Sequence, residues 1–182
     1  SIKGFIETLQ EGAAQDAESL RSFLDIIGRQ ADRLEAIIED LLMLARLEQD
    51  AGKSSIELSE SKIRDVIEAA IELTTVPAKA KGINLQVDCP PDLSAAINAP
   101  LIEQALVNLI DNAIKFSPEN SEVRISTAES VGMVIISVRD SGCGIAAEHL
   151  SRLFERFYRV DKARSREQGG TGLGLALSLI HI

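Results

Sequence analysis

Residues 98–116 read NAPLIEQALVNLIDNAIKF, an apolar run whose large side chains recur at helical spacing. Asn98 can cap the first turn, because its side-chain oxygen accepts a backbone N–H that has no partner inside a helix. Ser117-Pro118 ends the run, since the residue before a proline disfavours helical geometry. The sequence therefore predicts a helix over residues 101–116 with one side packed against a core.

The opposite side of this predicted helix carries Asn108, Asn112 and Lys115. Their spacing of four and three residues places them on one face. Amide oxygens can ligate a hard cation and an ammonium group can contact a phosphate, which suits Mg²⁺ held together with a nucleotide. A face of Asn, Asp and Lys is more often simply solvated, so both interpretations stay open on this helix alone.

Alternating apolar residues predict strands on both sides of the helix. Apolar and polar residues alternate over residues 83–87, which precede a predicted turn at residues 89–92. They alternate again over residues 123–127 and 134–138, which predicts a hairpin around residues 130–132. Their alternation indicates strands that are buried on one side only.

The region before these strands is less regular. Residues 56–58 can form an edge strand, and the helical period of residues 63–73 should be interrupted or restarted at Pro77. Together the predicted elements are helices layered on one antiparallel sheet, which is the α+β class.

Residues 1–49 contain no proline and read as two helices. The longer apolar stripe covers residues 20–44 and can be capped by Asp16 or Ser19. Such a helical hairpin has more apolar surface than two helices can bury, so we expect it to pair with a second copy as a dimeric four-helix bundle. The alternative is that it packs on the rest of its own chain. The small and polar residues 50–55 then read as a linker.

Composition narrows the possible functions. The chain has 182 residues, a formal charge of −9 and a pI of about 4.8, which argues against nucleic acid as a partner because phosphate contacts need clustered Lys and Arg. We expect neither a transmembrane helix nor a signal peptide in it. Cys89 and Cys143 stand in unrelated contexts, which favours free thiols over a disulfide or zinc framework.

Two glycine-rich motifs follow the predicted hairpin. In Asp140-Ser-Gly-Cys-Gly144 a carboxylate at a strand end can accept a hydrogen bond from an exocyclic amine, and the glycines let a flat base approach the backbone. Gly170-Thr-Gly-Leu-Gly174 leads into an apolar helix whose free N–H groups can bind phosphate. Each motif alone is weak evidence for a nucleotide site. The first is also a common turn, and the second lacks the P-loop lysine and the βαβ context of a dinucleotide site.

The order and spacing of these motifs resemble the sensor histidine kinases of two-component signalling. Residues 108–116 (Asn-Leu-Ile-Asp-Asn-Ala-Ile-Lys-Phe) are similar to the family's N box, and residues 140–144 to its first glycine box. Residues 154–159 (Phe-Glu-Arg-Phe-Tyr-Arg) resemble its F box, and residues 170–175 its second glycine box. Residues 1–48 are similar to the dimerisation helices of phosphate-regulon-type sensor kinases, so the resemblance covers nearly the whole chain.

The resemblance implies an α+β, Bergerat-type ATP-binding domain, a two-layer α/β sandwich shared with the Hsp90 and MutL ATPases. It also implies a dimerisation and phosphotransfer hairpin over residues 1–49, a linker over residues 50–55 and the ATP-binding domain over residues 56–182, which stops before the family's last strands. The parent protein would be an ATP-dependent histidine kinase that phosphorylates its own histidine and passes the phosphoryl group to an aspartate of a response regulator. This chain would be the cytoplasmic part of an inner-membrane sensor that reaches the membrane only through upstream segments.

The same resemblance implies ATP and Mg²⁺ as cofactors. Asn108 and Asn112 would ligate Mg²⁺ and phosphate, Lys115 would contact phosphate, and Asp140 would accept the adenine amino group. Arg159 is a further candidate for phosphate contact.

The glycines and aromatic residues have implied roles as well. The base pocket would be shaped by Gly142 and Gly144, and the phosphates would be covered by Gly170, Thr171, Gly172 and Gly174. Residues 161–168 would form a mobile lid. We expect Phe154 and Phe157 to anchor this lid as buried aromatics, since such residues are more often core than ligand contacts.

The family's phospho-acceptor histidine lies before the position of Ser1, so the resemblance implies that this chain does not phosphorylate itself. We expect His149 to be a surface residue of a helix. After Ala176 the family pattern is lost, and residues 177–182, with His181, match the translation of a sequencing adaptor. We therefore expect residues 177–182 not to be native.

Two other functions fit part of the sequence. In a nucleotide-binding interaction module, ATP would order the lid and the hairpin would recruit partners without catalysis. A hydrolase similar to Hsp90 or MutL would need a glutamate as water-activating base where Asn108 stands, and an amide cannot take a proton, so this reading is the weakest.

Overall fold

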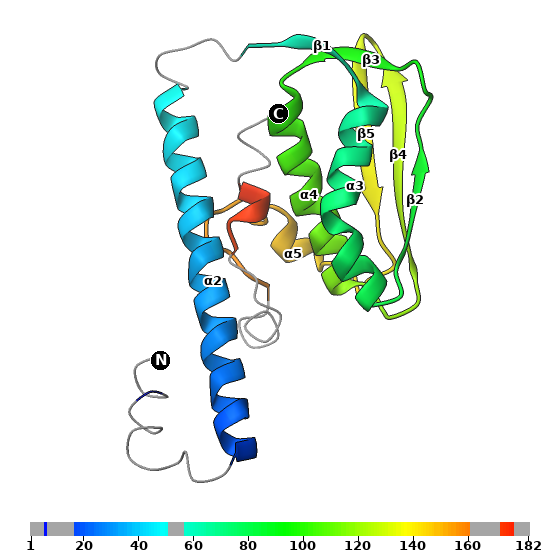
Figure 1. Cartoon of the computed structure of the whole chain (residues 1–182). Coiled ribbons are helices and arrows are strands. Elements are labelled where there is room, and N and C mark those ends of the chain that lie inside the picture. Colours follow the sequence, from blue (N-terminus) through cyan, green and yellow to red (C-terminus); the bar gives the residue numbers. More distant parts are fainter. Residues whose placement is uncertain (1–5, 7–16, 51–56, 161–171, 177–182) are drawn as a thin grey trace.

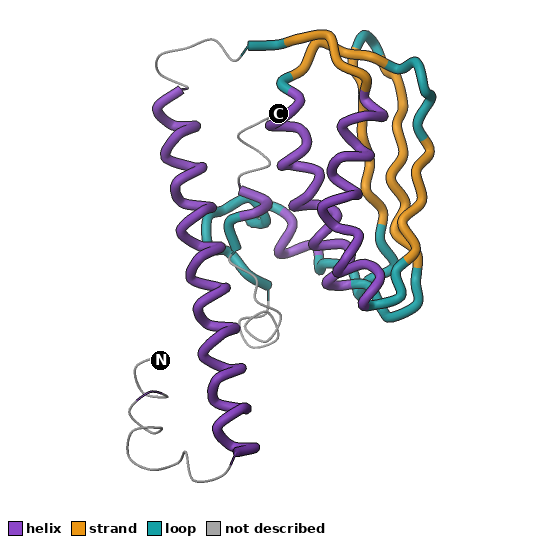
Figure 2. Tube along the Cα trace, viewed as in Figure 1, coloured by secondary structure: helices purple, strands orange, loops and turns teal. Residues whose placement is uncertain are grey.

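A computed structural model describes residues 6, 17–50, 57–160 and 172–176 of the chain (Figure 1). These residues form one long helix and an α/β domain, and Figure 2 shows the helices of that domain layered against its strands. Within the described ranges, no helix combines the length and apolar character of a membrane span.

Helix α2 (Ala17–Asp50) is 34 residues long and confirms the second helix expected of the N-terminal hairpin. Apolar side chains remain on its surface, between 49% and 55% exposed: Leu24, Leu34, Ile38 and Leu42. Of the residues predicted to form the first helix, Ile6 alone is described, and it is helical. The predicted linker lies outside the described residues apart from Asp50, so the structure does not test the hairpin.

The strands of the α/β domain form two sheets. Strand β1 (Ser59–Lys62) pairs antiparallel with β3 (Ser94–Ile97). The other sheet has the order β2–β4–β5, with β2 (Asn84–Asp88) parallel to β4 (Glu122–Ser130) and β4 antiparallel to β5 (Met133–Arg139). The strand over residues 83–87 and the hairpin over residues 123–138 are thereby confirmed.

Helices α3 (Ile63–Ala80) and α4 (Ala99–Phe116) lie side by side on one face of the three-stranded sheet (Figure 1). The short helix α5 (Ala147–Leu150) follows β5 and the first glycine box. Helices on one face of small sheets confirm the α+β class.

Three details of the predicted strands were wrong. Residues 57–58 are not a strand, and Leu58 is 62% exposed; the strand of this region, β1, begins at Ser59. The strands form two sheets instead of the one predicted, and the larger is not wholly antiparallel. The chain crosses from β2 to β4 through helix α4, and such a crossover makes the two strands parallel. Strand β3 was missed because its sequence, Ser-Ala-Ala-Ile, has no apolar alternation.

Pro77 does not interrupt α3, contrary to the prediction, and the helix continues to Ala80. A proline inside a helix removes one N–H and leaves the carbonyl four residues earlier without its helical partner. That carbonyl belongs to Leu73, and both Leu73 and Pro77 are exposed, so this side of the helix faces water that can solvate the freed group.

The core lies between α3, α4 and β4. Its largest fully buried side chains there are at most 1% exposed: Ile63, Ile67, Ile110, Val123 and Ile125. The apolar side of α4 is therefore buried as the sequence predicts, which fixes the direction in which its polar side points.

Side chains hold both ends of α4. Asn98 Oδ1 accepts the Leu101 N–H at 3.1 Å, which confirms the predicted cap. At the other end Lys81 Nζ donates to the carbonyl oxygens of Ile114 and Lys115 at 2.8 and 2.7 Å. Carbonyls in the last turn of a helix have no partner within it, and a cation there also favours the helix dipole. The end of α4 is thus tied to the turn that follows α3.

Shortening Ile110 to alanine tests whether α4 is fixed by its buried side. We expect Ile110→Ala to lower the free energy of unfolding by about 2–5 kcal/mol, since it leaves a cavity in a packed core. Leu73→Ala, at a position 63% exposed, should change it by less than about 0.5 kcal/mol. Urea denaturation of the two variants compares them, and equal losses would contradict this placement of the core.

Candidate functional site

Asn108, on the polar side of α4, contacts the second glycine box. Asn108 Nδ2 donates to the Gly174 carbonyl at 3.3 Å. A Cβ at position 174 would lie 3.5 Å from Asn108 Cγ, so the amide lies directly against the glycine backbone. Two motifs 66 residues apart in sequence therefore meet in space. Asn112, one turn further along, is half-buried on the same side of the helix.

Lys115 is paired within its own helix. Its Nζ lies 2.5 Å from Asp111 Oδ2, and the two side chains are 34% and 36% exposed. An anionic ligand would therefore have to share this ammonium group with Asp111. The described residues contain no group of three or more His, Cys, Asp and Glu side chains placed to hold a metal ion. Asn108 and Asn112 are the metal ligands that the sequence predicts.

Asp140 directly follows β5, and its carboxylate shapes the first glycine box. Asp140 Oδ1 accepts the Gly142 N–H at 2.7 Å. A Cβ on Gly142 would lie only 2.8 Å from the Phe116 carbonyl oxygen, a distance that side chains do not tolerate. Glycine at position 142 therefore lets the turn after β5 pack against the end of α4.

An open groove of about 410 Å³ lies between these elements. Its lining residues are Lys81, Lys115, Phe116, Ser117, Pro118, Ser141, Gly142 and Cys143. The lining includes Gly142 and Lys115 of the predicted site but not Asp140 or Gly144. Gly144 is exposed and has a φ of +70°, a left-handed conformation that favours glycine.

Phe116 and Lys81 line the groove but were not among the predicted site residues. Phe116 follows Asn112 by four residues, so helical spacing alone could have placed it on the same side. It is 44% exposed at the groove. Lys81 carries no comparable signal, because its contact with α4 depends on the tertiary fold.

The F box and the second glycine box are joined through their backbones. Phe157 N–H donates to the Gly172 carbonyl at 2.8 Å. Gly172 has a φ of +76°, and a Cβ on it would lie 3.0 Å from backbone atoms of Phe157. Leu173 next to it is completely buried. Gly170, Thr171 and the predicted lid over residues 161–168 lie outside the described residues.

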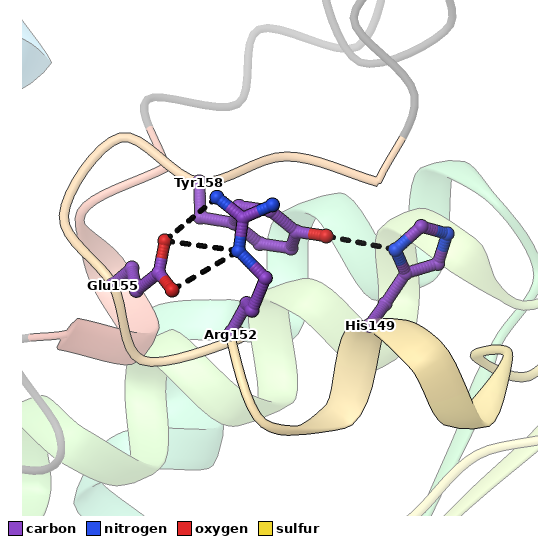
Figure 3. A network of polar contacts seen from close by, with 4 residues as sticks. All are labelled: His149, Arg152, Glu155 and Tyr158. Atoms are coloured by element: carbon purple, nitrogen blue, oxygen red, sulfur yellow. Dashed lines mark hydrogen bonds and ion pairs between the residues drawn. The ribbon is translucent and has the colours of Figure 1, made fainter.

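The expected burial of Phe154 and Phe157 was wrong, because they are 45% and 57% exposed. The next aromatic residue of the F box, Tyr158, has close side-chain partners, and its hydroxyl lies 2.7 Å from His149 Nδ1 (Figure 3). The Arg152 guanidinium lies over its ring, 4.3 Å from the centroid. His149 is therefore not the simple surface residue we expected; its side chain is 25% exposed. Its partner, nine residues later, could not be read from helical spacing.

Arg152 is itself oriented by Glu155. Arg152 Nε and Nη2 donate to the two carboxylate oxygens of Glu155 at 3.0 and 2.9 Å. These hydrogen bonds lower the pKa of the Glu155 carboxyl and raise the pKa of the Arg152 guanidinium. Both charges lie in solvent, where such pairs contribute little stability, so the pair chiefly orients Arg152 over Tyr158. Arg159, the last residue of the F box, is half-buried.

Comparison with known proteins identifies the class of this domain. Residues 97–180 match the family described as histidine kinase-, DNA gyrase B- and HSP90-like ATPases. The α/β domain with its asparagine-bearing helix and two glycine boxes is therefore an ATPase domain of this type. Residues 1–50 match the His Kinase A (phospho-acceptor) domain. With these two domains in this order, the chain belongs to the sensor histidine kinases.

Individual relatives agree with this family. Sensor-like histidine kinase SenX3 of Mycobacterium tuberculosis is 37% identical over 165 residues, which cover 91% of this chain and 40% of that protein. The chain thus spans about two fifths of the length of this relative. The structure of full-length ShkA in complex with AMPPNP has a TM-score of 0.65 at 28% identity, covering 88% of this chain and 33% of that one. Histidine kinase ThkA in complex with response regulator protein TrrA has a TM-score of 0.70 at 26% identity, covering 87% of this chain and 46% of that one.

Alanine substitutions at two glycines test the close approach of the F box to the second glycine box. Gly172 and Gly132 have nearly the same φ, +76° and +75°, but a Cβ on Gly132 would meet nothing within 4 Å. Each substitution should cost about 1 kcal/mol for the left-handed backbone. Only Gly172→Ala should also change the fluorescence of Tyr158, the single tyrosine in a chain without tryptophan. Unchanged emission in Gly172→Ala would contradict the contact.

Proposed function

We propose that the α/β domain binds MgATP and is the catalytic domain of an ATP-dependent protein histidine kinase, a transferase of two-component signal transduction. The observation that carries this proposal is the hydrogen bond from Asn108 to Gly174. It sets the polar side of α4 against the second glycine box. The groove bounded by Phe116 and Gly142 continues from the C-terminal end of the same helix.

The groove suits an adenine base. Its volume of about 410 Å³ is within the usual range of small-ligand sites. Phe116 offers an exposed aromatic ring for stacking, and Gly142 keeps the backbone accessible. Asp140 does not line the groove but precedes the lining residue Ser141, and one of its carboxylate oxygens is fixed by the Gly142 N–H. Its other oxygen would accept the exocyclic amine of a base that extends beyond the groove, and Gly144 would lie beside that base.

The polar side of α4 fits the magnesium triphosphate. The amide nitrogen of Asn108 is taken by the Gly174 carbonyl, which leaves its oxygen as the ligating atom, and Asn112 supplies a second amide oxygen one turn away. Mg²⁺ prefers oxygen ligands and completes its octahedron with phosphate oxygens and water. When bound, it would neutralise charge on the transferring phosphoryl group.

The remaining predicted residues would contact the phosphates. Lys115 would exchange part of its pairing with Asp111 for a phosphate oxygen, and Arg159 would add a second cation. Backbone N–H groups of the second glycine box would bind the phosphates where the box leads into a helix. Its contributing residues would be Gly170, Thr171, Gly172 and Gly174.

The wider organisation is also proposed. Residues 1–49 would form a dimerisation hairpin, supported by the exposed apolar side chains of α2, with a linker over residues 50–55 and the ATP-binding domain over residues 56–182. The complex of ThkA with TrrA supports a response-regulator receiver domain as partner. We place the chain in the cytoplasmic part of an inner-membrane sensor, whose upstream segments would reach the membrane.

Replacing Asp140 by asparagine tests the base pocket. Because the carboxylate would accept the adenine amino group, Asp140→Asn should weaken MgATP binding about tenfold or more, the usual effect of losing a charge-assisted hydrogen bond. Titration with a fluorescent ATP analogue, with Mg²⁺ or with EDTA, measures this. Asp92→Asn, in an exposed turn, is the matched control. Equal affinity for ATP and GTP in the unmodified chain would contradict recognition by Asp140.

Phosphoryl transfer separates the kinase from a non-catalytic nucleotide-binding module. The histidines of this chain are His149 and His181, and neither lies in residues 1–50. The assay therefore supplies a separate hairpin that carries an acceptor histidine, together with radioactive ATP. We expect label on that hairpin, and loss of label when Asn112 is replaced by alanine. Nucleotide binding without any transfer would support the module, and release of phosphate alone would support a hydrolase.

A further inference from the structure

The polar network around Tyr158 lies outside the predicted ATP site but is connected to it. We propose that Tyr158, held by His149 and Arg152, is a positioning residue that fixes the second glycine box against Asn108. This inference rests on the proposed ATP-binding function and assigns residues that set the phosphate end of that site.

Tyr158 is held on its hydroxyl and on its ring. The hydroxyl is 2.7 Å from His149 Nδ1, and the Arg152 guanidinium lies 4.3 Å from the ring centroid (Figure 3). Glu155 holds Arg152 in place with both of its carboxylate oxygens. A phenol ring with a partner at its tip and a cation over its face has few orientations left.

The segment from His149 to Tyr158 also forms a series of hydrogen-bonded backbone turns. Arg152 N–H donates to the His149 carbonyl at 3.0 Å, and Glu155 N–H donates to the Arg152 carbonyl at 3.0 Å. Tyr158 N–H then donates to the Glu155 carbonyl at 3.1 Å. The network thus spans the segment from α5 to the F box with both backbone and side-chain contacts.

Phe157, next to Tyr158, has a strained backbone. Its φ is +63°, a left-handed conformation that is unfavourable for a bulky residue. The residue is 57% exposed, so burial does not account for the conformation. The constraints come from either side: the hydrogen bond to the Gly172 carbonyl and the fixed neighbour Tyr158. Such strain persists where the surrounding structure determines it, and it is typical of ligand sites.

The Phe157–Gly172 hydrogen bond links the constrained backbone of Phe157 to the second glycine box of the proposed ATP site. Gly172 is followed by Leu173, which is completely buried and allows the box little freedom to shift. The carbonyl of Gly174, two residues after Gly172, accepts from Asn108 Nδ2. Greater freedom of Tyr158 would therefore let the second glycine box move at the phosphate-binding end of the proposed ATP site. The base-binding end of that site, built from the turn after β5 and the end of α4, would be unaffected.

Comparison of MgATP with adenosine on the full chain tests this division. Tyr158→Phe removes the hydroxyl but keeps the ring, and His149→Phe removes its partner. Each should raise the Kd for MgATP about threefold to tenfold, the effect of one net hydrogen bond, and leave the Kd for adenosine unchanged. His149→Asn, whose amide can stand where Nδ1 does, should restore most of the affinity. Ser151→Ala, exposed on the same turn, is the control and should change neither value.

A purely structural role predicts a different result. Equal losses for MgATP and adenosine, or no loss in either variant, would overturn the proposal. So would additive losses in the Tyr158→Phe/His149→Phe double variant, because both changes remove the same hydrogen bond.

Amide exchange of Phe157, followed by NMR without nucleotide, provides a readout that does not depend on ATP binding. Faster exchange in Tyr158→Phe and His149→Phe, but not in Ser151→Ala, supports the proposal, and unchanged exchange overturns it. Should the unmodified chain bind neither MgATP nor adenosine, the proposed function fails, while this exchange measurement still decides whether Tyr158 positions the box.

Discussion

The contact between the Asn108 side chain and the Gly174 carbonyl joins the two parts of the chain on which the site depends. The asparagines of α4 point away from the core because the other side of the helix is buried, with Ile110 completely inaccessible. The second glycine box lies against this polar side, where the Gly174 backbone is in van der Waals range of the Asn108 amide. Core packing thus fixes the direction of the polar side of α4, and the Asn108 hydrogen bond joins that side to the glycine box.

The site combines fixed and adjustable parts. The end of α4 is held by Lys81, and the turn after β5 is held against it at Gly142, so the groove between them is built from well-packed backbone. Lys115 is different, since its ammonium is paired with an aspartate that also borders solvent. The groove therefore combines packed backbone with a lysine whose ion pair lies at the protein surface.

Local patterns predicted much of this structure, and the failures have physical causes. The cap at Asn98, the extent of α4 and the β4–β5 hairpin depend on neighbouring residues and could be read directly. The parallel pairing of β2 with β4 and the contact of Lys81 with α4 depend on residues far apart in sequence, so no local pattern reveals them. Among the aromatics, general burial tendencies favoured Phe154 and Phe157, whereas the held residue is Tyr158, because a hydroxyl can find a polar partner at the protein surface.

The parallel pairing also bears on how the chain reaches its folded state. Strand β2 ends at Asp88 and β4 begins at Glu122, so the connection between them contains β3 and all of α4. The sheet cannot be completed until this long loop closes, and loop closure of that kind slows folding relative to local hairpins. Helix α4, which carries the asparagines, is therefore also the crossover that makes β2 and β4 parallel. Refolding kinetics of the domain would report on the formation of this helix and of the sheet together.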